Sequence, residues 1–294
     1  MVSCNPFLLP GHWFKGALHV HTTCSDGRLS PADVVALYRS RGYHFVVITD
    51  HNRRTDVSGL SAPDFLVIPG VELGWGCNEL GQPYHFVLAG LRGELSWPVE
   101  LSIERVVAHL RGLAPLVLLA HPYWSGMTVA EMAALEGVAG LEVYNTSAET
   151  DLGKGLSSVH WDDLLARGKR WWGYAVDDSH GINDDLDGGW VWVKAGSLSE
   201  ESVLSALAAG AFYSSSGPEI HDFRLEGEVA TVRCSPVQRI NFLGQAQWGF
   251  QRRAGQGDGL SCAEYRLCGR ELYLRVECID AHGRTAWTNP LFLS

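Results

Sequence analysis

The stretch FVVITDH, residues 45–51, shows the pattern from which the fold can be predicted. An apolar run rich in β-branched residues is typical of a strand buried on both faces, and here it is followed at once by polar residues. The same order recurs in LVLLAHP, residues 116–122, and in GYAVDDSH, residues 173–180. We therefore interpret the chain as a series of buried strands that end in functional side chains.

Eight runs are candidate strands, and several are separated by amphipathic helices. The runs are residues 17–21, 45–49, 65–69, 85–89, 116–120, 141–144, 172–176 and 190–193. Helix starts are indicated by Ser30-Pro31, by a capping box from Thr128 to Glu131, and by Ser199 before two acids. Buried strands that alternate with helices predict an α/β fold built on a parallel sheet or barrel.

The last quarter of the chain has a different pattern. Between residues 272 and 278 apolar and polar residues alternate, which is the period of a strand, and glycine-rich segments at 255–259 and 280–283 predict turns. Several short strands without helices favour a small β-sandwich. With 294 residues, we expect two domains, 1–217 and 218–294.

Composition limits the classes of function. The net charge is −10, with 33 acids against 23 Lys and Arg, which disfavours broad membrane binding and binding to long duplex nucleic acid. Neither a signal peptide nor an apolar run of membrane-spanning length is visible, so we expect a soluble cytoplasmic protein. The seven cysteines show no CxxC spacing and are expected to be reduced and mostly buried.

Histidine is unusually frequent, with 12 residues, and several follow predicted strands together with carboxylates. The carboxyl ends of neighbouring parallel strands meet at one edge, so these side chains are expected to converge. Imidazole and carboxylate ligands suit Zn, Mn or Fe, and their number exceeds what one ion needs. A single His-x-His or Ala-His-Pro has common structural explanations, but the recurrence at successive strand ends favours a multinuclear metal site. The candidate ligands are His19, His21, Asp26, His51, Glu72, His85, His121, Asp178 and His180.

The motifs resemble those of the polymerase-and-histidinol-phosphatase (PHP) domain family over residues 14–217, in family order. They are HVH (19–21) with SDG (25–27), TDH (49–51), PGVE (69–72), AHP (120–122) and DSH (178–180). The resemblance implies a distorted (β/α)7 barrel with two or three divalent metal ions. AHPYW (120–124), EVYN (142–145) and the sandwich-like tail are similar to the branch that includes carbamate-ester hydrolases.

The resemblance also implies how the ligands divide among the ions. The first ion would take His19, His21, Glu72 and Asp178; the second Glu72, His85 and His121; the third Asp26, His51 and His180. Some members place a histidine after the first motif, where this chain has Asp26, and the spacing from Glu72 to His85 varies in the family. Asp50 is open to two roles, as a direct ligand or as a residue that orients a histidine.

The expected chemistry is hydrolysis. Two metal ions lower the pKa of a shared water, so that a bridging hydroxide can attack phosphorus or a carbonyl carbon near neutral pH. The catalytic candidates are Glu72, which would bridge the ions, Asp178, and His180, which would protonate a leaving group in the absence of a third ion, a role equally open to His51.

Substrate contacts are predicted at residues near the strand ends. Arg53 and Arg54 follow His51 and suit a phosphate group, although a solvated surface pair is an equal alternative. The other candidates are Arg28, Tyr123, Asn145 and His160, and Trp124 is a candidate for an aromatic pocket wall.

Three functions remain open at this point. The first is a phosphoesterase acting on a small phosphate ester or a short nucleotide. The second is a hydrolase of carboxylic esters, carbamates or amides on the same metal centre. The third is a non-catalytic binding module, against which the intact ligand set argues. A homo-oligomer is compatible with each of them.

Overall fold

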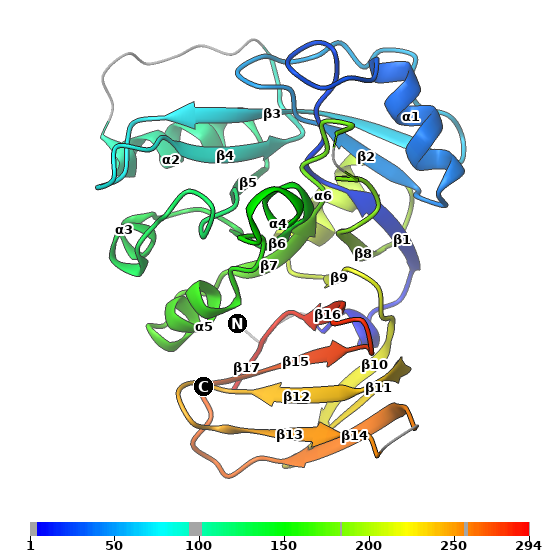
Figure 1. Ribbon diagram of the computed structural model, residues 1–294, viewed down its shortest axis with the longest axis vertical. Helices are drawn as coiled ribbons and strands as arrows, with labels where there is room; N and C mark the ends of the chain where they lie inside the picture. The colour runs from blue at the N-terminus through cyan, green and yellow to red at the C-terminus, as the bar shows by residue number, and fades with distance from the viewer. Residues whose placement is uncertain (1–4, 94–101, 183, 256–257, 294) are drawn as a thin grey trace.

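The computed structural model describes residues 5–93, 102–182, 184–255 and 258–293 (Figure 1). Cys4 and residues 256–257 of the predicted 255–259 turn lie outside these ranges. The upper part of Figure 1 holds strands β1–β9 and the α-helices, and the lower part holds strands β10–β17. The chain is therefore α/β in its first three quarters and all-β afterwards, as its sequence predicts.

The described residues include one mixed sheet of 14 strands. Its upper part contains β1 (His12–Ala17), β2 (Phe45–Ile48), β3 (Leu66–Trp75), β4 (Tyr84–Ala89), β5 (Leu116–Leu119), β6 (Gly140–Asn145), β7 (Trp172–Val176), β8 (Trp190–Ala195) and β9 (Phe212–Ser215). Its lower part contains β12 (Arg239–Leu243), β13 (Gly249–Arg253), β15 (Tyr273–Ile279), β16 (Thr285–Thr288) and β17 (Leu291–Phe292). The order along the sheet is β13-β12-β15-β16-β9-β8-β1-β2-β3-β4-β5-β6-β7, with β17 paired to β15.

The pairing is parallel only in part, which corrects the expectation of a parallel sheet. β1, β2 and β3 are parallel, and so are β5, β6 and β7, but β4 runs antiparallel to both of its neighbours. The physical reason is the short connection between β3 and β4, residues 76–83, because a crossover to a parallel strand needs a dozen residues or more. β8 and β9 are also antiparallel to their neighbours.

The first strand ends earlier than the sequence pattern predicts. The run 17–21 was expected to be a strand, whereas β1 covers His12–Ala17 and pairs with β8 along that length. Residues 18–21 continue beyond the paired region, where Val20 makes an isolated bridge with Ser179. His19 and His21 therefore lie past the strand, at the edge where other strands end.

The sheet curves so that β7 comes against β9 without strand pairing. The Ser214 hydroxyl donates to the Gly173 carbonyl at 2.8 Å and accepts the Ala175 N–H at 3.0 Å. The core on one side of the curved strands is apolar and fully buried, with Phe45, Leu118 and others packed together with residues of α6. Burial of this size supplies the main driving force for folding.

The helices begin where their caps predict. They are the 3-10 helix η1 (Pro6–Leu8), α1 (Pro31–Ser40), α2 (Ile103–Leu113), α3 (Val129–Ala134), α4 (Thr146–Leu152), α5 (Ser158–Ala166) and α6 (Glu200–Ala208). Ser30 caps α1, Thr128 forms the capping box of α3 with Glu131, and the Ser199 side chain accepts the Ser202 N–H at the start of α6. None of the helices in the described ranges is long and apolar enough to cross a membrane.

The C-terminal strands form two layers around one core. β10 (Ile220–Glu226), β11 (Val229–Val237) and β14 (Leu260–Arg266) make a three-stranded sheet. Its buried residues pack with those of β12, β15 and β16 in the large sheet. The large sheet continues from β9 to β16, so hydrogen bonding passes across the predicted boundary at residue 217. Residues of η1 also join this region, since the Asn5 side chain donates to the Phe223 carbonyl at 2.7 Å.

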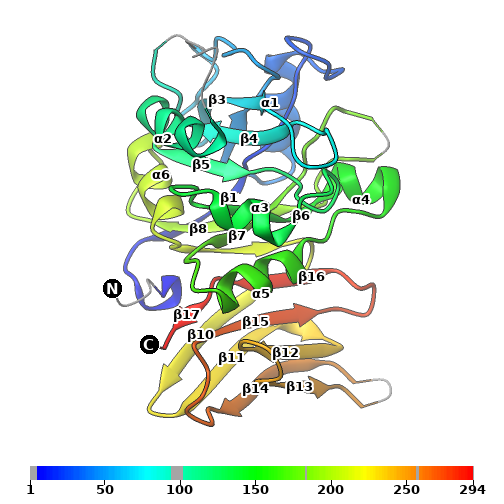
Figure 2. The ribbon, with the colours of Figure 1, turned by 90° about the vertical axis from the view of Figure 1, so that its left-hand side faces the viewer.

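A buried arginine joins the two parts where α5 contacts β15, at the level where the helix lies above the C-terminal strands in Figure 2. Arg275 of β15 is fully buried and binds both carboxylate oxygens of Asp162 in α5, through Nε and Nη2 at 2.7 Å each. Its Nη1 donates to Glu277 at 2.8 Å, and its guanidinium lies 4.7 Å from the ring centre of Trp161. We call this group, Arg275 with Asp162, Glu277 and Trp161, the interface cluster.

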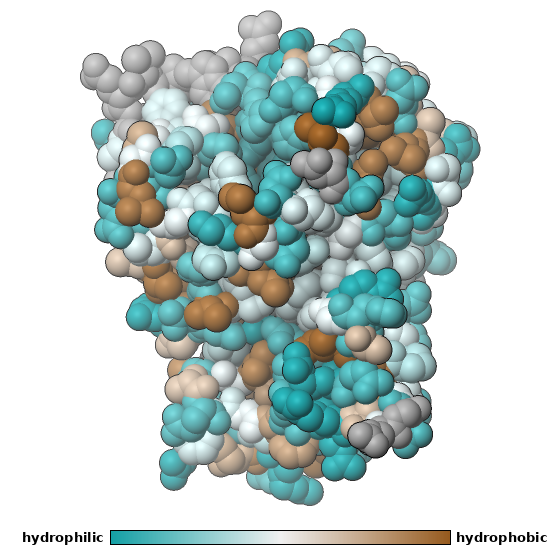
Figure 3. Space-filling model, in the orientation of Figure 1, coloured by the Kyte–Doolittle hydropathy of each residue, from teal (hydrophilic) through white to brown (hydrophobic). Residues whose placement is uncertain are grey.

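The six described cysteines are free, but the expectation that they are mostly buried is wrong. Cys234 and Cys278 are buried between the C-terminal layers, whereas Cys77, Cys262 and Cys268 are exposed. Cys77 and Cys268 lie in connections, and Cys262 lies on β14, which is an edge strand. On the face drawn in Figure 3, hydrophobic residues form small patches separated by hydrophilic ones.

Candidate metal centre

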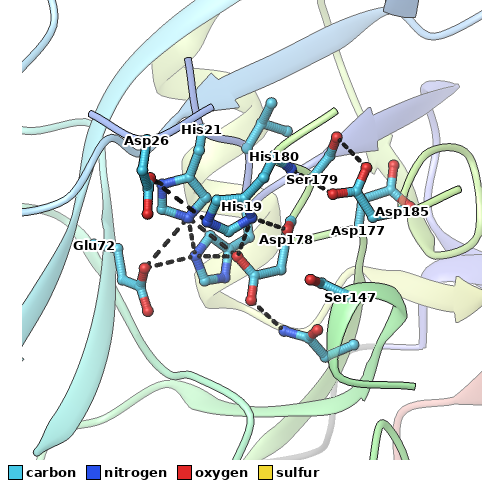
Figure 4. Close-up of polar contacts among 12 residues, drawn as sticks. His19, His21, Asp26, Glu72, Ser147, Asp177, Asp178, Ser179, His180 and Asp185 are labelled. Atoms are coloured by element: carbon cyan, nitrogen blue, oxygen red, sulfur yellow. Dashed lines mark hydrogen bonds and ion pairs between the residues drawn. The ribbon is translucent and has the colours of Figure 1, made fainter. Parts of the chain in front are cut away.

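The structure brings all nine predicted ligand residues together (Figure 4 shows six of them). Their ligand atoms form three groups, and within each group the atoms lie within 4.8 Å of one another. The groups are His19, His21, Glu72 and Asp178; Glu72, His85 and His121; and His21, Asp26, His51 and His180. These are the sets that the resemblance implies, with His21 as an added member of the third. We call the nine residues the metal cluster.

The topology explains why these residues meet. His51, His121 and Asp178 follow the ends of β2, β5 and β7, which share one edge of the sheet. His85 lies near the start of β4, and because β4 is antiparallel its start lies at that same edge. Glu72 lies within β3, which is long enough to reach past the end of β2.

Glu72 occupies the middle of the cluster and is almost completely buried. Its Oε2 lies 3.2 Å from His19 Nε2 and 2.9 Å from His51 Nδ1. Its Oε1 lies 2.7 Å from His85 Nδ1 and 3.2 Å from His121 Nε2. Each oxygen thus faces a different set of imidazoles, which is the arrangement expected of a carboxylate shared by two ions.

The tautomer of His19 shows why the cluster suits a cation. His19 Nδ1 lies 2.7 Å from Glu142, so this nitrogen carries the proton and donates it. In the neutral ring, Nε2 then directs a lone pair toward His21 Nε2 at 3.1 Å and toward the oxygens of Glu72 and Asp178 at 3.2 Å each. Converging lone pairs and carboxylates repel one another unless a proton or a metal ion lies between them.

The pKa values reflect the same geometry. Burial alone would lower the pKa of His21, but its hydrogen bonds with the Asp178 and Glu72 carboxylates raise the pKa to about 9. Burial would raise the pKa of Glu72 and of Asp178, but attraction to the His19 ring holds both well below their usual range. In the chain by itself, protons on the imidazoles balance the carboxylates, and a bound metal ion would take their place.

The third group is more open than the other two. Asp26 lies 3.4 Å from His51 Nε2, 3.6 Å from His180 Nε2 and 3.7 Å from His21 Nδ1. The Asp26 side chain is 55% exposed, whereas Glu72 is 1% exposed. The rings of His21 and His180 stack with centroids 4.1 Å apart. An ion at this group would have solvent on one side.

A second layer of polar residues holds the ligands, and sequence reasoning missed its main member. Glu142 is fully buried on β6, and its Oε2 accepts the His121 N–H and an Asn145 side-chain N–H, each at 2.8 Å. Asn145 Nδ2 also lies 3.1 Å from Asp178 Oδ2. Such partners fix the orientation and basicity of metal-binding side chains. The available signal was a carboxylate inside an otherwise apolar strand run, 141–144, because a buried charge needs a partner.

Asp50 takes the orienting position rather than joining any of the three groups. Its carboxylate accepts the Ser25 hydroxyl at 2.7 Å, the Thr22 N–H at 2.8 Å and the Thr55 hydroxyl. Burial would raise the pKa of Asp50, but these hydrogen bonds lower it. Ser25 Oγ in turn lies 3.5 Å from His21 Nδ1, so Asp50 holds the loop that carries Asp26.

The backbone is strained at two of the ligands. His121 has a φ of 27° and Asp178 a φ of 54°, values that side chains other than glycine rarely adopt. Strain of this kind concentrates at functional sites, where the surrounding structure maintains it.

A cavity of about 310 Å³ lies over the metal cluster. Beside seven of the ligands it is lined by Trp124, Ser147, Ala148, Asp151, Ile182 and Asp185. Trp124 was expected as an aromatic wall, and the other five were not foreseen because they come from α4 and the loop after β7. The described lining contains neither Lys nor Arg.

The six predicted substrate-binding residues lie outside this lining. Arg28, Arg53 and Arg54 are exposed on loops beside the ligands. Tyr123 is 43% exposed, and its ring centre lies 6.0 Å from that of the half-buried His160. Asn145 is buried in the second layer described above. Their contact with substrate stays a prediction.

Comparisons with known proteins support the fold. Neither the protein-family models nor the curated proteins gave a match. Among solved structures, a two-domain protein from Bacteroides vulgatus that contains a predicted PHP-like metal-dependent phosphoesterase is similar with a TM-score of 0.53 and 13% identity, over 95% of both chains. An amidohydrolase from Chromobacterium violaceum, with bound sulfate and no metal, is similar with a TM-score of 0.44 and 16% identity, over 58% of this chain and 89% of that one. The chain therefore has the fold of the PHP-like two-domain protein along almost its whole length, as its motifs indicated.

Proposed function

We propose that this protein is a metal-dependent hydrolase that acts on small phosphate esters, including phosphomonoesters, phosphodiesters and short nucleotides. The observation that carries the proposal is the arrangement of nine ligand residues in three groups, with Glu72 shared by two of them. A set of imidazoles and carboxylates with no thiolate fits Zn, Mn or Fe.

The charge of the loaded site favours a phosphate over a neutral ester. The first two groups contain only two carboxylates, Glu72 and Asp178, against two divalent ions. The local excess of positive charge at these two ions would bind an anionic phosphate group directly, while Asp26, Asp151 and Asp185 supply negative charge elsewhere in the cavity lining.

The residues of the metal cluster would have different roles in hydrolysis. Ions bound at the cluster would activate water and polarise the ester oxygen. Glu72 would hold the first two groups at a fixed separation, and Asp178 would complete the first. With no ion at the third group, His180 or His51 would carry the proton to the leaving group, and His180 is oriented for this by its Nδ1, which lies 2.8 Å from the Asp178 carbonyl.

The second candidate is hydrolysis of a carboxylic ester, a carbamate or an amide at the same centre. The observation in its favour is the cavity wall, which contains Trp124, Ala148 and Ile182 but no Lys or Arg in its described lining. A wall that combines these apolar side chains with Asp151 and Asp185 and has no fixed cation suits an uncharged substrate better than a free phosphate monoester.

An activity panel on protein of measured metal content tests both candidates. It compares phosphomonoesters, phosphodiesters, carboxylic esters, carbamates and amides after reconstitution with Mn, Zn or Fe. We expect phosphate esters to be hydrolysed and the activity to follow metal content. Turnover of carbon esters alone would replace the first candidate by the second, and absence of turnover by fully metallated protein would favour a non-catalytic module.

The proposal also covers the barrel, the domains, the family branch and the number of ions. We propose that strands β1–β7 correspond to a distorted (β/α)7 barrel within residues 1–217, that residues 218–294 form a β-sandwich, and that the chain belongs near the carbamate-ester branch. Two or three ions would be bound. The net charge of −10 supports a small-molecule substrate rather than long duplex nucleic acid. We propose a cytoplasmic location. Sedimentation measurements would test whether the protein forms a homo-oligomer.

A further inference from the structure

Two arginines face each other on neighbouring C-terminal strands. Arg239 of β12 and Arg253 of β13 are direct cross-strand partners in the antiparallel pair. Like charges in this position destabilise a sheet because their side chains lie within about 5 Å of each other at Cβ. Arg239 is half-buried and Arg253 is exposed, and a bound anion would relieve the repulsion between them.

The described part of the chain does not provide a counter-charge. In the ranges that the structure describes, neither arginine makes an ion pair with a carboxylate, and Arg239 Nε is buried without a hydrogen-bond partner. Asp280 lies close by, but its carboxylate is taken by Arg284, at 2.7 Å from Nη2 and 2.8 Å from Nε. An unsatisfied buried donor is unfavourable, so Arg239 Nε favours the binding of an acceptor.

Arg253 is held in place by a chain of hydrogen bonds across three strands. Its Nε donates to Gln251 Oε1 at 2.6 Å, and Gln251 Nε2 donates to Asn241 Oδ1 at 2.9 Å. Asn241 Nδ2 donates to Glu277 at 3.2 Å, and Glu277 accepts from the buried Arg275 at 2.8 Å. This row orients the guanidinium of Arg253 through Nε and leaves its two terminal nitrogens for another partner.

Both arginines line a cavity of about 370 Å³, which is large enough for a small ligand. The rest of the lining comes from Gln238, Ala254, Ile279 and the turn after β15, including Asp280, Ala281 and Gly283. The start of β12 and the ends of β13 and β15 lie together at the right-hand edge of the lower part of Figure 1. None of these lining residues belongs to the cavity over the metal cluster.

We propose that Arg239 and Arg253 form a second binding site, which takes a small ligand bearing a phosphate group. Guanidinium groups bind phosphate oxygens through paired, charge-assisted hydrogen bonds, and two of them match the double negative charge of phosphate near neutral pH. The site is independent of the proposed hydrolytic function, because it uses other residues in another part of the chain.

Isothermal titration of the full-length, metal-loaded protein with inorganic phosphate at low ionic strength tests the site. We expect Arg239→Gln and Arg253→Gln each to weaken one phosphate-binding event at least about tenfold, which corresponds to the loss of a charge-assisted hydrogen bond. Phosphate bound at the metal cluster is a separate event, seen as inhibition of hydrolysis, and should be unchanged in these variants. Arg252→Gln is the matched control, since Arg252 lies on the same strand but on the opposite face.

Thermal unfolding gives a second measurement that does not depend on activity. Without phosphate, each Gln variant should melt at a higher temperature than wild type because the repulsion between the arginines is relieved. Phosphate should raise the melting temperature of wild type more than that of the double variant. The proposal is overturned by phosphate titrations that are the same in wild type and the double variant, by an equal loss in Arg252→Gln, or by equal affinity for acetate at matched ionic strength.

Discussion

Two clusters of buried charge in this protein are balanced in opposite ways. In the interface cluster, the guanidinium of Arg275 meets two carboxylates within 2.8 Å, so its charges are paired inside the chain. In the metal cluster, the chargeable partners of the Glu72 and Asp178 carboxylates are imidazoles, which balance them only when protonated, and Asn145 adds only a neutral hydrogen bond to Asp178.

The difference shows which cluster balances its charges within the chain and which needs protons or ions to do so. Buried charges cost free energy unless they are paired, and in the interface cluster they are paired by side chains of the chain itself. The metal cluster becomes paired near neutral pH either by keeping protons on imidazoles or by taking up ions. Substitutions in the first should therefore change stability, and substitutions in the second should change metal content and catalysis.

The strongest test of the metal cluster is Glu72→Gln. An amide cannot serve as a shared anionic ligand, so we expect kcat to fall at least about 10³-fold, the size of effect seen when a principal electrostatic contribution to catalysis is lost. Activity and metal content are measured together on purified protein. Glu136→Gln, an exposed residue paired with Lys169, is the control and should keep full activity. Full turnover by Glu72→Gln would rule out the proposed role.

The corresponding substitution in the interface cluster is Arg275→Met. It leaves Asp162 and Glu277 without their partner, and breaking a buried pair costs about 3–5 kcal/mol. We expect the free energy of unfolding in urea to fall by that amount while metal content stays the same. Arg275→Lys keeps the charge but loses the two-pronged contact, and should lie between the two proteins. A drop in metal content in folded Arg275→Met would show that the clusters are not separate.

Removal of metal should affect stability through the metal cluster only. Ions bound at a hundredfold excess over Kd stabilise the folded state by about 2.7 kcal/mol per site. A chelator should therefore lower the melting temperature of wild type and of Arg275→Met by similar amounts, because distant changes are additive. Calorimetric scans with and without chelator measure this. In Glu72→Gln the chelator should have a much smaller effect.

The second layer allows a finer test, because Glu142 touches the ligands but belongs to none of the three groups. Glu142→Gln keeps the shape and weakens the acceptor for His19 Nδ1 and the His121 N–H. Changes in this layer typically cost 10- to 100-fold in metal affinity or activity. Titration of the apoprotein with Zn or Mn measures the affinity. An unchanged affinity together with an unchanged pH profile would assign Glu142 a purely structural role.

The contrast between these residues also shows what can be predicted from sequence. Seven of the nine candidate ligands follow apolar strands, so their convergence follows from the topology. The other two, Glu72 within β3 and His85 near the start of β4, join them because of the length of β3 and the antiparallel direction of β4. Glu142 has no such marker beyond its place in an apolar run, and its role depends on which two histidines its oxygens reach. The antiparallel direction of β4 was missed because the apolar runs for parallel and central antiparallel strands look alike.

The arginines also show where prediction from the sequence fails. Arg53 and Arg54 were chosen as substrate contacts for their position next to His51, yet both are exposed outside the cavity lining. Arg239, Arg253 and Arg275 carry no sequence marker, because cross-strand register decides whether an arginine meets a carboxylate, another arginine or solvent.

The smallest expected effect concerns Glu271, which lies in the connection between β14 and β15 and whose carboxylate, like those of the interface cluster, has hydrogen-bond partners within the chain. Burial would raise the pKa of Glu271, but its hydrogen bonds with the Cys268 N–H and the Tyr265 hydroxyl lower the pKa to about 2. Since the folded pKa lies below the unfolded value of about 4.3, the ionised group adds stability above that pH and loses it as pH falls toward 2. We expect wild type to exceed Glu271→Gln by about 1 kcal/mol at pH 7 in urea unfolding, with the difference shrinking between pH 4.5 and 2. The difference at pH 7 should be the same with and without chelator, and a dependence on metal would contradict the separation of the two clusters.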